Sequence, residues 1–336
     1  MKHPERIAVI GSGSWGTALA IVLANNNINV DLYTLFPDQQ DEINTKHTNN
    51  AYLPGVVLNP KIIASTYLNS VLTGKEYILL VVPSHSMRSV VREIKPFIHE
   101  NTVLIHATKG IELETYLRMS EVIKEELPEL PEGNIVVLSG PSHAEEVSRQ
   151  LPTTIVAASS DLTYAKQVQD IFMNNDFRVY TNDDVTGVEL AGALKNIIAL
   201  GAGMSDGLGF GDNAKAALIT RGLTEISRLG IELNARATTF AGLAGVGDLI
   251  VTCTSKHSRN WRAGYSLGQG EELEEVLDKM GMVVEGVKAT KAAYYLAAKH
   301  NVEMPITAEI YKVLFEGKSP QTAVDDLMGR RKKEEI

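Results

Sequence analysis

The stretch RIAVIGSGSWGTAL, residues 6–19, decides the fold of the first half of the chain. Arg6–Ile10 is largely apolar and predicts a strand, and the residues after the glycines predict a helix. In this setting Gly11 makes the tight turn, Gly13 lets a pyrophosphate approach bare backbone, and Gly16 lets the helix pack on the strand. The helix N-terminus then offers N–H groups and a positive dipole end to phosphates. The stretch predicts a dinucleotide-binding turn, with a purely structural glycine turn as the alternative.

Short apolar runs alternate with helical patterns through the rest of this half. Several runs are almost continuously apolar, as expected for strands covered on both faces of a parallel sheet. The predicted strands are Arg6–Ile10, Val30–Leu35, Tyr77–Val82, Thr102–Ala107, Ile135–Leu138, Thr154–Ala158 and Phe177–Tyr180. The predicted helices between them include Ser14–Asn26, Ser86–Ile98 and Glu114–Leu127. This alternation predicts an α/β fold, a Rossmann-like doubly wound sheet.

The second half of the chain has a helical pattern. The predicted helices are Gly187–Gly201, Ala214–Leu229, Ala235–Ala241, Leu273–Lys279, Lys288–Lys299 and Thr307–Leu314, and only Met282–Val284 is an ambiguous strand. We therefore expect a dinucleotide-binding domain at residues 1–188 and an all-α substrate and catalytic domain at 189–336. No Pro- or Ser-rich linker separates them, so we expect the domains to abut along a helix.

Composition narrows the class of function. The 336 residues carry a net charge of −9 and give a pI near 5.5, which argues against general nucleic-acid binding but allows a small anionic ligand. One cysteine, Cys253, excludes an internal disulfide and a cysteine-rich metal cluster, and the histidines show no metal-ligand spacing. No uninterrupted apolar run approaches the length of about 20 residues that a membrane span needs. We expect a soluble cytoplasmic protein without a metal.

Two segments that follow predicted strands carry polar groups where ligands bind in open α/β sheets. The first is His106–Gly110, in which Lys109 is either a ligand-binding cation or a solvated loop lysine. The second is Gly140–Glu146, in which Ser142 either binds a ligand or caps a helix.

Lys195 and Asn196 interrupt an otherwise small and aliphatic helix. A lysine that reaches solvent from a narrow exposed stripe is the alternative. However, the flanking residues are apolar or small on nearly every side. Burial disfavours the charged ammonium, which makes a lysine a usable proton donor and acceptor near neutrality. The pattern favours a functional lysine.

Further candidates follow in a glycine-punctuated region. Asp248 and Thr252 lie close together in the sequence, and Ser258, Arg259 and Asn260 follow them. An arginine can bind a phosphate or carboxylate through two hydrogen bonds. Taken singly, these residues would more often cap helices or lie on the surface. Without metal or cysteine chemistry, a cofactor must carry the reaction, and the protein supplies orientation and proton transfer.

The choice between NAD and NADP is normally made at the end of the second strand, by an acid or an arginine. Here Leu35 and Phe36 occupy the expected positions, and Asp38 lies too far along. The sequence leaves the cofactor as NAD or NADP.

As an ordered set, several segments resemble the NAD(P)-dependent glycerol-3-phosphate dehydrogenases of the soluble bacterial type. The matching runs are Gly11–Gly16, Asn50–Gly55, Ala107–Gly110, Gly140–Val147, Glu189–Gly211, Gly245–Thr252, Ser258–Asn260 and Val284–Gly286. The resemblance spans residues 6 to 325 or so. It implies interconversion of sn-glycerol 3-phosphate and dihydroxyacetone phosphate, which feeds glycerophospholipid synthesis, by a protein that is usually dimeric. An arginine common in relatives is replaced at Leu35-Phe36, so a strong NADP preference is in doubt.

The resemblance also assigns roles. It makes Lys195 the general acid/base, with Asp248 and Thr252 as its polar partners and Asn196 nearby. The substrate-binding residues it implies are Lys109, Gly140, Ser142, Lys195, Asp248, Ser258, Arg259 and Asn260. The cofactor-binding residues are Gly11, Gly13, Ser14, Trp15, Gly16, Tyr52, Lys109, Ala144, Arg259, Val283 and Glu285. The site is expected between the two domains.

Two other functions stay open at this stage. Another two-domain reductase, such as a 3-hydroxyacid dehydrogenase, would separate the catalytic lysine and asparagine by a helical turn, whereas Lys195 and Asn196 are adjacent. A catalytically silent dinucleotide-sensing module would have no need of a proton donor and an anion-binding set.

Overall fold

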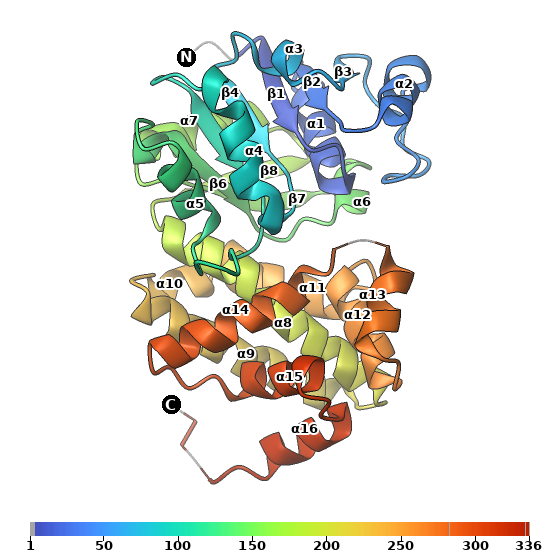
Figure 1. Ribbon diagram of the computed structural model, residues 1–336, viewed down its shortest axis with the longest axis vertical. Coiled ribbons are helices and arrows are strands. Elements are labelled where there is room, and N and C mark those ends of the chain that lie inside the picture. Colours follow the sequence, from blue (N-terminus) through green and yellow to red (C-terminus); the bar gives the residue numbers. More distant parts are fainter. Residues whose placement is uncertain (1–3, 282, 333, 336) are drawn as a thin grey trace. The chain divides into compact units, whose positions relative to one another are not determined.

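The computed structural model describes residues 4–281, 283–332 and 334–335, and it divides into two compact units (Figure 1). The first unit comprises the chain up to Glu112 together with Leu117–Glu189. The second comprises Leu113–Tyr116 and the chain from Leu190 on. This division and the proposed domain boundary between residues 188 and 189 differ by one residue and by the short segment Leu113–Tyr116.

The first unit is built on one eight-stranded sheet with the order β3-β2-β1-β4-β5-β6-β7-β8. The strands are β1 (Arg6–Ile10), β2 (Asn29–Tyr33), β3 (Ile62–Ser65), β4 (Tyr77–Leu80), β5 (Val103–His106), β6 (Ile135–Ser139), β7 (Thr153–Ala158) and β8 (Phe177–Asn182). The order of β1 to β6 is that of the dinucleotide-binding fold, in which ligands bind where the strand order reverses, here between β1 and β4. The predicted doubly wound fold is confirmed.

The sheet departs from the sequence prediction in two respects. Strand β3 was not predicted, because it is a short edge strand in which Ile63 is half exposed and no continuous apolar run marks it. Strand β7 pairs with β6 in the antiparallel direction, so the sheet is parallel only from β3 to β6 and again between β7 and β8. Apolar content alone does not specify strand direction.

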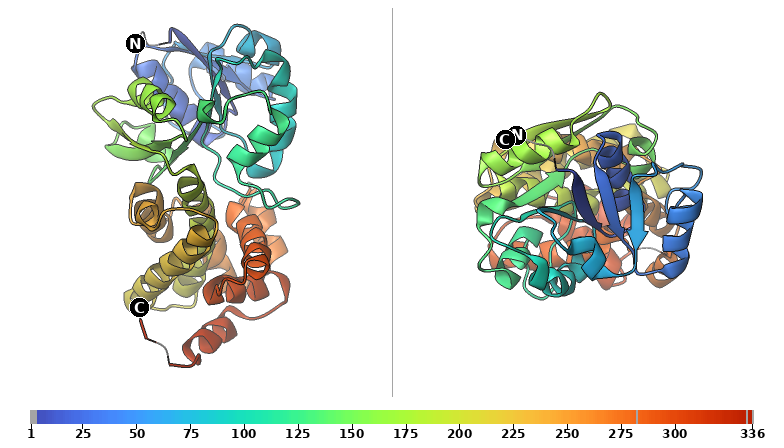
Figure 2. Two further views of the ribbon diagram at one scale, coloured as in Figure 1. Left: turned by 90° about the vertical axis from the view of Figure 1, so that its left-hand side faces the viewer. Right: turned by 90° about the horizontal axis from the view of Figure 1, so that it is seen from above.

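Helices cover both faces of this sheet. They are α1 (Ser14–Asn25), α2 (Pro37–Lys46), α3 (Leu68–Leu72), α4 (Met87–Ile94), α5 (Met119–Glu126), α6 (Ala144–Val147) and α7 (Leu162–Phe172). Side chains alternate between the faces of a strand. Accordingly, Ile7 and Val9 share one core with α1 and α7, whereas Ala8 and Ile10 share another with α4 and α5. Figure 2 shows α2 at the β3 end of the sheet.

Two predicted helices of this unit are shorter than expected. The segment Ser86–Ile98 contains α4, but single 3₁₀ turns flank it, and Pro96 lies in the second of them. The segment Glu114–Leu127 becomes helical only at Met119. Tyr116 has a positive φ of 62°, which breaks the helical path, and the Glu121 carboxylate accepts from the backbone N–H of Arg118 at the new start.

From Leu190 on, the described residues contain helices and no strand. The helices are α8 (Val185–Gly207), α9 (Asp212–Glu232), α10 (Ala237–Phe240), α11 (Asp248–Thr254), α12 (Arg259–Gly268), α13 (Leu273–Met280), α14 (Glu285–Lys299), α15 (Pro305–Phe315) and α16 (Pro320–Met328). Helices α11, α12 and α16 were not predicted, and a π-helical turn, Leu243–Gly247, precedes α11. Val283 and Val284 of the ambiguous strand are not in a strand, and Met282 lies outside the described residues.

Two segments are apolar and long enough to cross a membrane by composition alone. The first, Val185–Gly207, is 83% buried inside the protein, which is typical of a core helix. The second, Ala237–Thr254, is interrupted by the bend and the π turn between α10 and α11. Neither is a continuous exposed apolar helix.

Helices α8 and α12 pack closely because glycines line their contact. A Cβ on Gly264 would lie 2.0 Å from the Leu200 carbonyl oxygen, and one on Gly203 would lie 2.1 Å from that of Trp261. This close approach places the start of α12, with Asn260, against the middle of α8, with Asn196. Small residues at this crossing therefore hold two candidate site segments together.

We expect Gly264→Ala to lower the free energy of unfolding by about 1–3 kcal/mol, because backbone atoms on the facing helix have no room to move. Urea denaturation would measure it. Gly211→Ala is the matched control, since a Cβ there would meet nothing within 4 Å and its φ is negative. Equal stability of both variants would contradict close packing at this crossing.

A buried carboxylate in the second unit ties α9 to α15. Glu225 is 3% exposed and accepts hydrogen bonds from the backbone N–H groups of Ile306 (2.7 Å) and Thr307 (3.1 Å). Burial raises the pKa of Glu225 to about 7, and these hydrogen bonds oppose the increase.

We expect Glu225 to make stability fall as the pH rises from about 4.5 to about 7. In that window the folded state holds a proton that the unfolded state has released, so unfolding becomes easier with increasing pH. Denaturation midpoints across this range would measure the slope. Glu225→Gln should flatten it, and an unchanged slope in that variant would assign the pH dependence to other groups.

Candidate functional site

The glycine turn has the geometry that a dinucleotide requires. Gly11 has a φ of +113°, and a Cβ there would lie 2.3 Å from the Val81 carbonyl oxygen. A Cβ on Gly16 would lie 1.9 Å from the carbonyl oxygen of Gly11, so the helix can approach the strand only without one. At Gly13, by contrast, a Cβ would reach only the Tyr52 ring, at 4.0 Å, so the backbone in front of the turn is open.

Helix α1 begins at Ser14, directly behind this open backbone. No side chain caps its N-terminus, and its first turn contains no acidic residue. The amide groups at this end and the helix dipole therefore suit a phosphate. Ser14 Oγ donates to the Tyr52 carbonyl oxygen (2.8 Å), which holds the 49–55 loop beside the turn, and Trp15 is half-buried against the core. These residues fit a pyrophosphate-containing cofactor.

The second edge segment lies at the ends of β5 and β6. Lys109 Nζ donates to the Gly140 carbonyl oxygen (3.0 Å), and Ser142 Oγ donates to the same oxygen (2.8 Å). Ala144 is buried at the start of α6. Strands β1, β4, β5 and β6 run parallel, so the glycine turn and these residues follow strand ends at one edge of the sheet. The structure thus groups Lys109, Gly140 and Ser142.

His106, at the other end of the Lys109 segment, belongs to the core. It is fully buried, and its Nε2 lies 3.2 Å from Glu189 Oε1. Arg118 Nη1 donates to Glu189 Oε2 (2.6 Å). Burial acts to raise the pKa of Glu189, but the hydrogen bond to His106 and the charge of Arg118 outweigh it and lower this pKa to about 2. Glu189 is therefore a carboxylate that fixes the start of α8.

The decisive arrangement in the second unit is a buried ammonium group. Lys195 is 6% exposed, and its Nζ donates to Asp248 Oδ1 (2.6 Å) and Thr252 Oγ1 (2.5 Å). Asp248 and Thr252 lie one turn apart on α11, so both point to the same side. The Thr252 hydroxyl donates its hydrogen to the Asp248 carbonyl oxygen (2.6 Å). The lone pairs of Thr252 Oγ1 therefore remain to accept from Lys195. The Asp248 carboxylate offsets the cost of burying the ammonium.

A second polar chain runs beside this pair. Asn260 Nδ2 donates to Asn196 Oδ1 (2.8 Å), and the Gly286 N–H donates to Asn260 Oδ1 (2.8 Å). Ser258 caps α12, and its Oγ accepts from the Trp261 N–H (3.2 Å). Between these two buried residues, Arg259 is exposed.

Two of the predicted cofactor residues lie at the start of α14. Val283 is half-buried in the segment before that helix, and Glu285, also half-buried, is its first residue. The backbone N–H of Gly286, the next residue, donates to Asn260 Oδ1, so this segment lies beside the hydrogen-bonded pair Asn196 and Asn260. The structure brings Val283, Glu285 and the asparagine pair into one region of the second unit.

The positions just after β2 that normally select between NAD and NADP hold neither an acid nor an arginine. Leu35 and Phe36 are 71% and 54% exposed, and Asp38 lies in the first turn of α2. An acid would hydrogen-bond a ribose hydroxyl and an arginine would bind a 2′-phosphate. The structure supplies neither at these positions.

The described residues form no arrangement suited to metal or thiol chemistry. Among the described residues, no three or more His, Cys, Asp or Glu side chains are grouped to hold a metal ion. Cys253 is fully buried, and burial raises the pKa of its thiol to about 12. The thiol therefore stays protonated.

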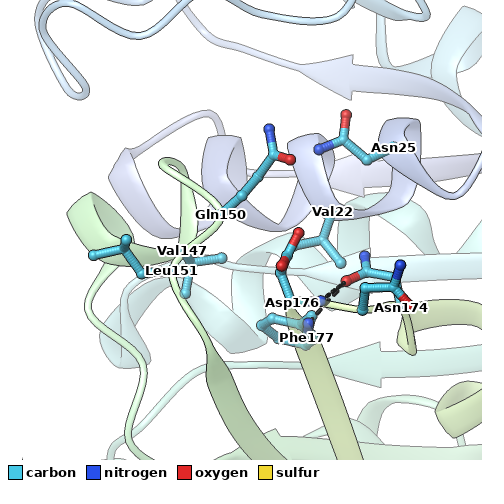
Figure 3. A pocket seen from close by; sticks show the side chains of 9 residues that line it. Val22, Asn25, Val147, Gln150, Leu151, Asn174, Asp176 and Phe177 are labelled. Atoms are coloured by element: carbon cyan, nitrogen blue, oxygen red, sulfur yellow. Dashed lines mark hydrogen bonds between the residues drawn. The ribbon is translucent and has the colours of Figure 1, made fainter.

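A pocket in the first unit is lined by none of the predicted site residues. It has a volume of about 210 Å³ and lies between the end of α1 and the start of β8 (Figure 3). Asn25, Gln150 and Asp176 line it, and no Lys or Arg does. Without a cation it does not suit a phosphorylated ligand.

Sequence reasoning missed two buried amides near the glycine turn, Gln39 on α2 and Asn49 in the following loop. Both contact Ser12 of the turn. Their signal was weak, because a lone amide in a polar segment reads as a surface residue.

Comparison with known proteins decides the family. Residues 6–165 match the family model for the N-terminus of NAD-dependent glycerol-3-phosphate dehydrogenase, and residues 184–325 match that for its C-terminus. The chain belongs to this family. A relative from Bacillus cytotoxicus, named glycerol-3-phosphate dehydrogenase [NAD(P)+], is 59% identical over 98% of this chain and 97% of its own length.

Solved structures of this dehydrogenase family agree. A glycerol-3-phosphate dehydrogenase from Coxiella burnetii is 42% identical and superposes with a TM-score of 0.93, covering 97% of this chain and 99% of its own. One from Plasmodium falciparum is 25% identical with a TM-score of 0.87, covering 99% and 97%. The dehydrogenase family and its fold thus extend over nearly the whole chain.

Proposed function

We propose that this protein interconverts sn-glycerol 3-phosphate and dihydroxyacetone phosphate with NAD(H) or NADP(H). The observation that carries the proposal is the buried Lys195, held by Asp248 and Thr252, in a chain of this dehydrogenase family. Reduction of the ketone requires a hydride on carbon and a proton on oxygen. A positioned ammonium supplies the proton and stabilises the negative charge that develops on that oxygen.

The cofactor is assigned to the glycine turn and its neighbours. Gly11, Gly13, Ser14 and Gly16 would form the pyrophosphate site: the backbone is open at Gly13 and α1 begins at Ser14, while Gly11 and Gly16 allow the tight turn and the close packing behind them. Further contacts are assigned to Trp15, Tyr52, Lys109, Ala144, Arg259, Val283 and Glu285. When bound, the nicotinamide supplies or accepts the hydride.

The protein's own residues manage the proton and the charge. Lys195 gives its proton to the substrate oxygen in reduction and removes it in oxidation. Asp248 and Thr252 keep the amine oriented from two sides. After reduction the amine takes up a proton from solvent, and after oxidation it releases one to solvent.

The substrate phosphate is assigned to cations that outweigh the net negative charge locally. Arg259 and Lys109 supply positive charge, and hydrogen-bonding groups are assigned to Gly140, Ser142, Ser258 and Asn260. We further propose that the enzyme acts in the cytoplasm as a homodimer and supplies glycerol 3-phosphate for glycerophospholipid synthesis.

An absorbance assay tests the activity. The purified protein is given dihydroxyacetone phosphate with NADH and, separately, with NADPH, and oxidation of the cofactor is followed. We expect turnover with at least one cofactor and none when a 2-keto acid replaces the substrate. Turnover of the keto acid alone would assign the protein to another class of reductase.

A further inference from the structure

Five polar side chains are buried beneath the glycine turn. They come from the turn, α1, the end of β2, α2 and the loop after α2. They are Ser12, Thr17, Thr34, Gln39 and Asn49, each less than 9% exposed. Polar groups buried in this way must be hydrogen-bonded, and their partners show what the cluster holds in place.

The cluster converges on one backbone oxygen, the carbonyl of Ser12. Gln39 Nε2 donates to it at 2.8 Å, Asn49 Nδ2 at 3.0 Å and Thr17 Oγ1 at 3.2 Å. The Ser12 hydroxyl in turn donates to Gln39 Oε1 (2.8 Å). Hydrogen bonds therefore hold both the side chain and the carbonyl oxygen of Ser12.

The two amides are themselves locked. Besides Ser12, Gln39 Nε2 donates to Asn49 Oδ1 (3.0 Å), and Asn49 Nδ2 donates to Thr17 Oγ1 (2.8 Å). Each NH₂ group thus uses both of its hydrogens. Thr34 also donates to Gln39 Oε1. Rotation of either amide would break several buried hydrogen bonds at once.

Fixing this carbonyl also fixes the next amide. In a trans peptide the C=O of one residue and the N–H of the next point in opposite directions, and the described chain contains no cis peptide. With the Ser12 oxygen turned into the cluster, the Gly13 N–H points away from it. Gly13 is the residue with open backbone at the start of α1.

We infer that Gln39 and Asn49 are positioning residues for the cofactor. They hold the Ser12–Gly13 peptide so that the Gly13 N–H faces the pyrophosphate, and they act without touching the cofactor. The inference rests on the proposed assignment of the cofactor to this turn. It extends the turn's function to two side chains that follow it by 27 and 37 residues, the separations of Ser12 from Gln39 and Asn49.

This arrangement makes a specific prediction for the two cofactors. NADH and NADPH share the pyrophosphate and differ only at the adenosine ribose, near the end of β2 in this fold. A residue that acts through the Gly13 N–H should therefore affect both equally. A residue that contacts the ribose should not.

The test is direct titration of NADH and NADPH fluorescence with the purified full-length protein. Asn49→Leu removes both N–H donors of the amide while keeping the branched shape of the side chain and the backbone hydrogen bonds from Tyr52 and Leu53. We expect its Kd to rise about tenfold for both cofactors, the size of effect that follows from weakening a hydrogen bond to a charged group. At saturating NADH, kcat should stay within about twofold. Gln39→Met removes one donor to the Ser12 carbonyl oxygen. It should raise the Kd for NADH and the Kd for NADPH by the same factor.

Asn134→Leu is the matched control. Asn134 is also a buried amide of the first unit, and its Nδ2 donates to the carbonyl oxygens of Glu100 (2.9 Å) and Thr102 (3.1 Å). It precedes β6, at the edge opposite the glycine turn. It should lose stability in urea denaturation as Asn49→Leu does, but keep its cofactor Kd.

Three results would overturn the inference. They are unchanged Kd values in folded Asn49→Leu and Gln39→Met, a loss confined to one cofactor, or an equal loss in Asn134→Leu. If Asn49→Leu does not fold, Gln39→Met alone decides. Failure of the unaltered protein to bind either cofactor would instead reject the proposed function.

Discussion

Lys195→Ala is expected to lower kcat for reduction of dihydroxyacetone phosphate by about 10²- to 10⁴-fold, the range that a positioned acid or base contributes. The Kd for NADH should stay nearly unchanged, because the glycine turn lies in the other unit and keeps its structure. Steady-state kinetics and a fluorescence titration would measure the two quantities. Near-normal turnover would remove Lys195 from the proposed role.

This variant also leaves the Asp248 carboxylate buried without its partner, which costs stability of about 3–5 kcal/mol. The double variant Lys195→Met/Asp248→Asn removes that stranded charge. It should recover much of the stability and keep the low kcat, so that loss of chemistry and loss of fold are separated. Lys299→Ala, an exposed lysine at the end of α14, should be neutral in both measurements.

Arg259→Ala is expected to lower kcat/KM for dihydroxyacetone phosphate by about 10²- to 10³-fold, as for the loss of one partner of a charged pair. Activity with unphosphorylated dihydroxyacetone should change much less, because that substrate has no phosphate for the guanidinium to bind. Comparing the two substrates in one assay measures the difference.

Arg262→Ala provides the control, since Arg262 is an exposed arginine one turn further along the same helix. Its kcat/KM should match that of the unaltered enzyme. Arg259→Lys should recover only part of the loss, because an ammonium cannot form the two parallel hydrogen bonds of a guanidinium. Equal losses with both substrates would show that Arg259 does not read the phosphate.

The elements that the sequence predicted well are those with a strong local signal. The strand, glycine turn and helix at residues 6–25 carry their geometry in the spacing of three glycines. The burial of Lys195 was predicted because an ionisable side chain stood alone in an apolar helix. In both cases residues close in the chain determine the outcome.

The elements that were missed depend on distant residues. The edge strand β3 has no long apolar run, and α11 and α12 are short helices beside glycine-rich turns. Nothing in residues 248–252 predicts that they face residue 195, since the Lys195–Asp248 contact spans 53 residues of chain. Reasoning from the residues alone did not identify Asp248 and Thr252 as the partners of Lys195, and only the family resemblance named them.

Composition and spacing alone predicted an α/β part and a helical part, the glycine turn and the burial of Lys195. Periodicity and glycine spacing are local properties, and burial of an apolar helix follows from its composition. The folded structure was needed to show that Asp248 and Thr252 contact and orient that lysine, that β7 reverses direction, and that Gln39 and Asn49 hydrogen-bond to the Ser12 carbonyl. The reason is that a buried polar atom needs a partner, but the chain can supply it from any distance, and only folding selects which one.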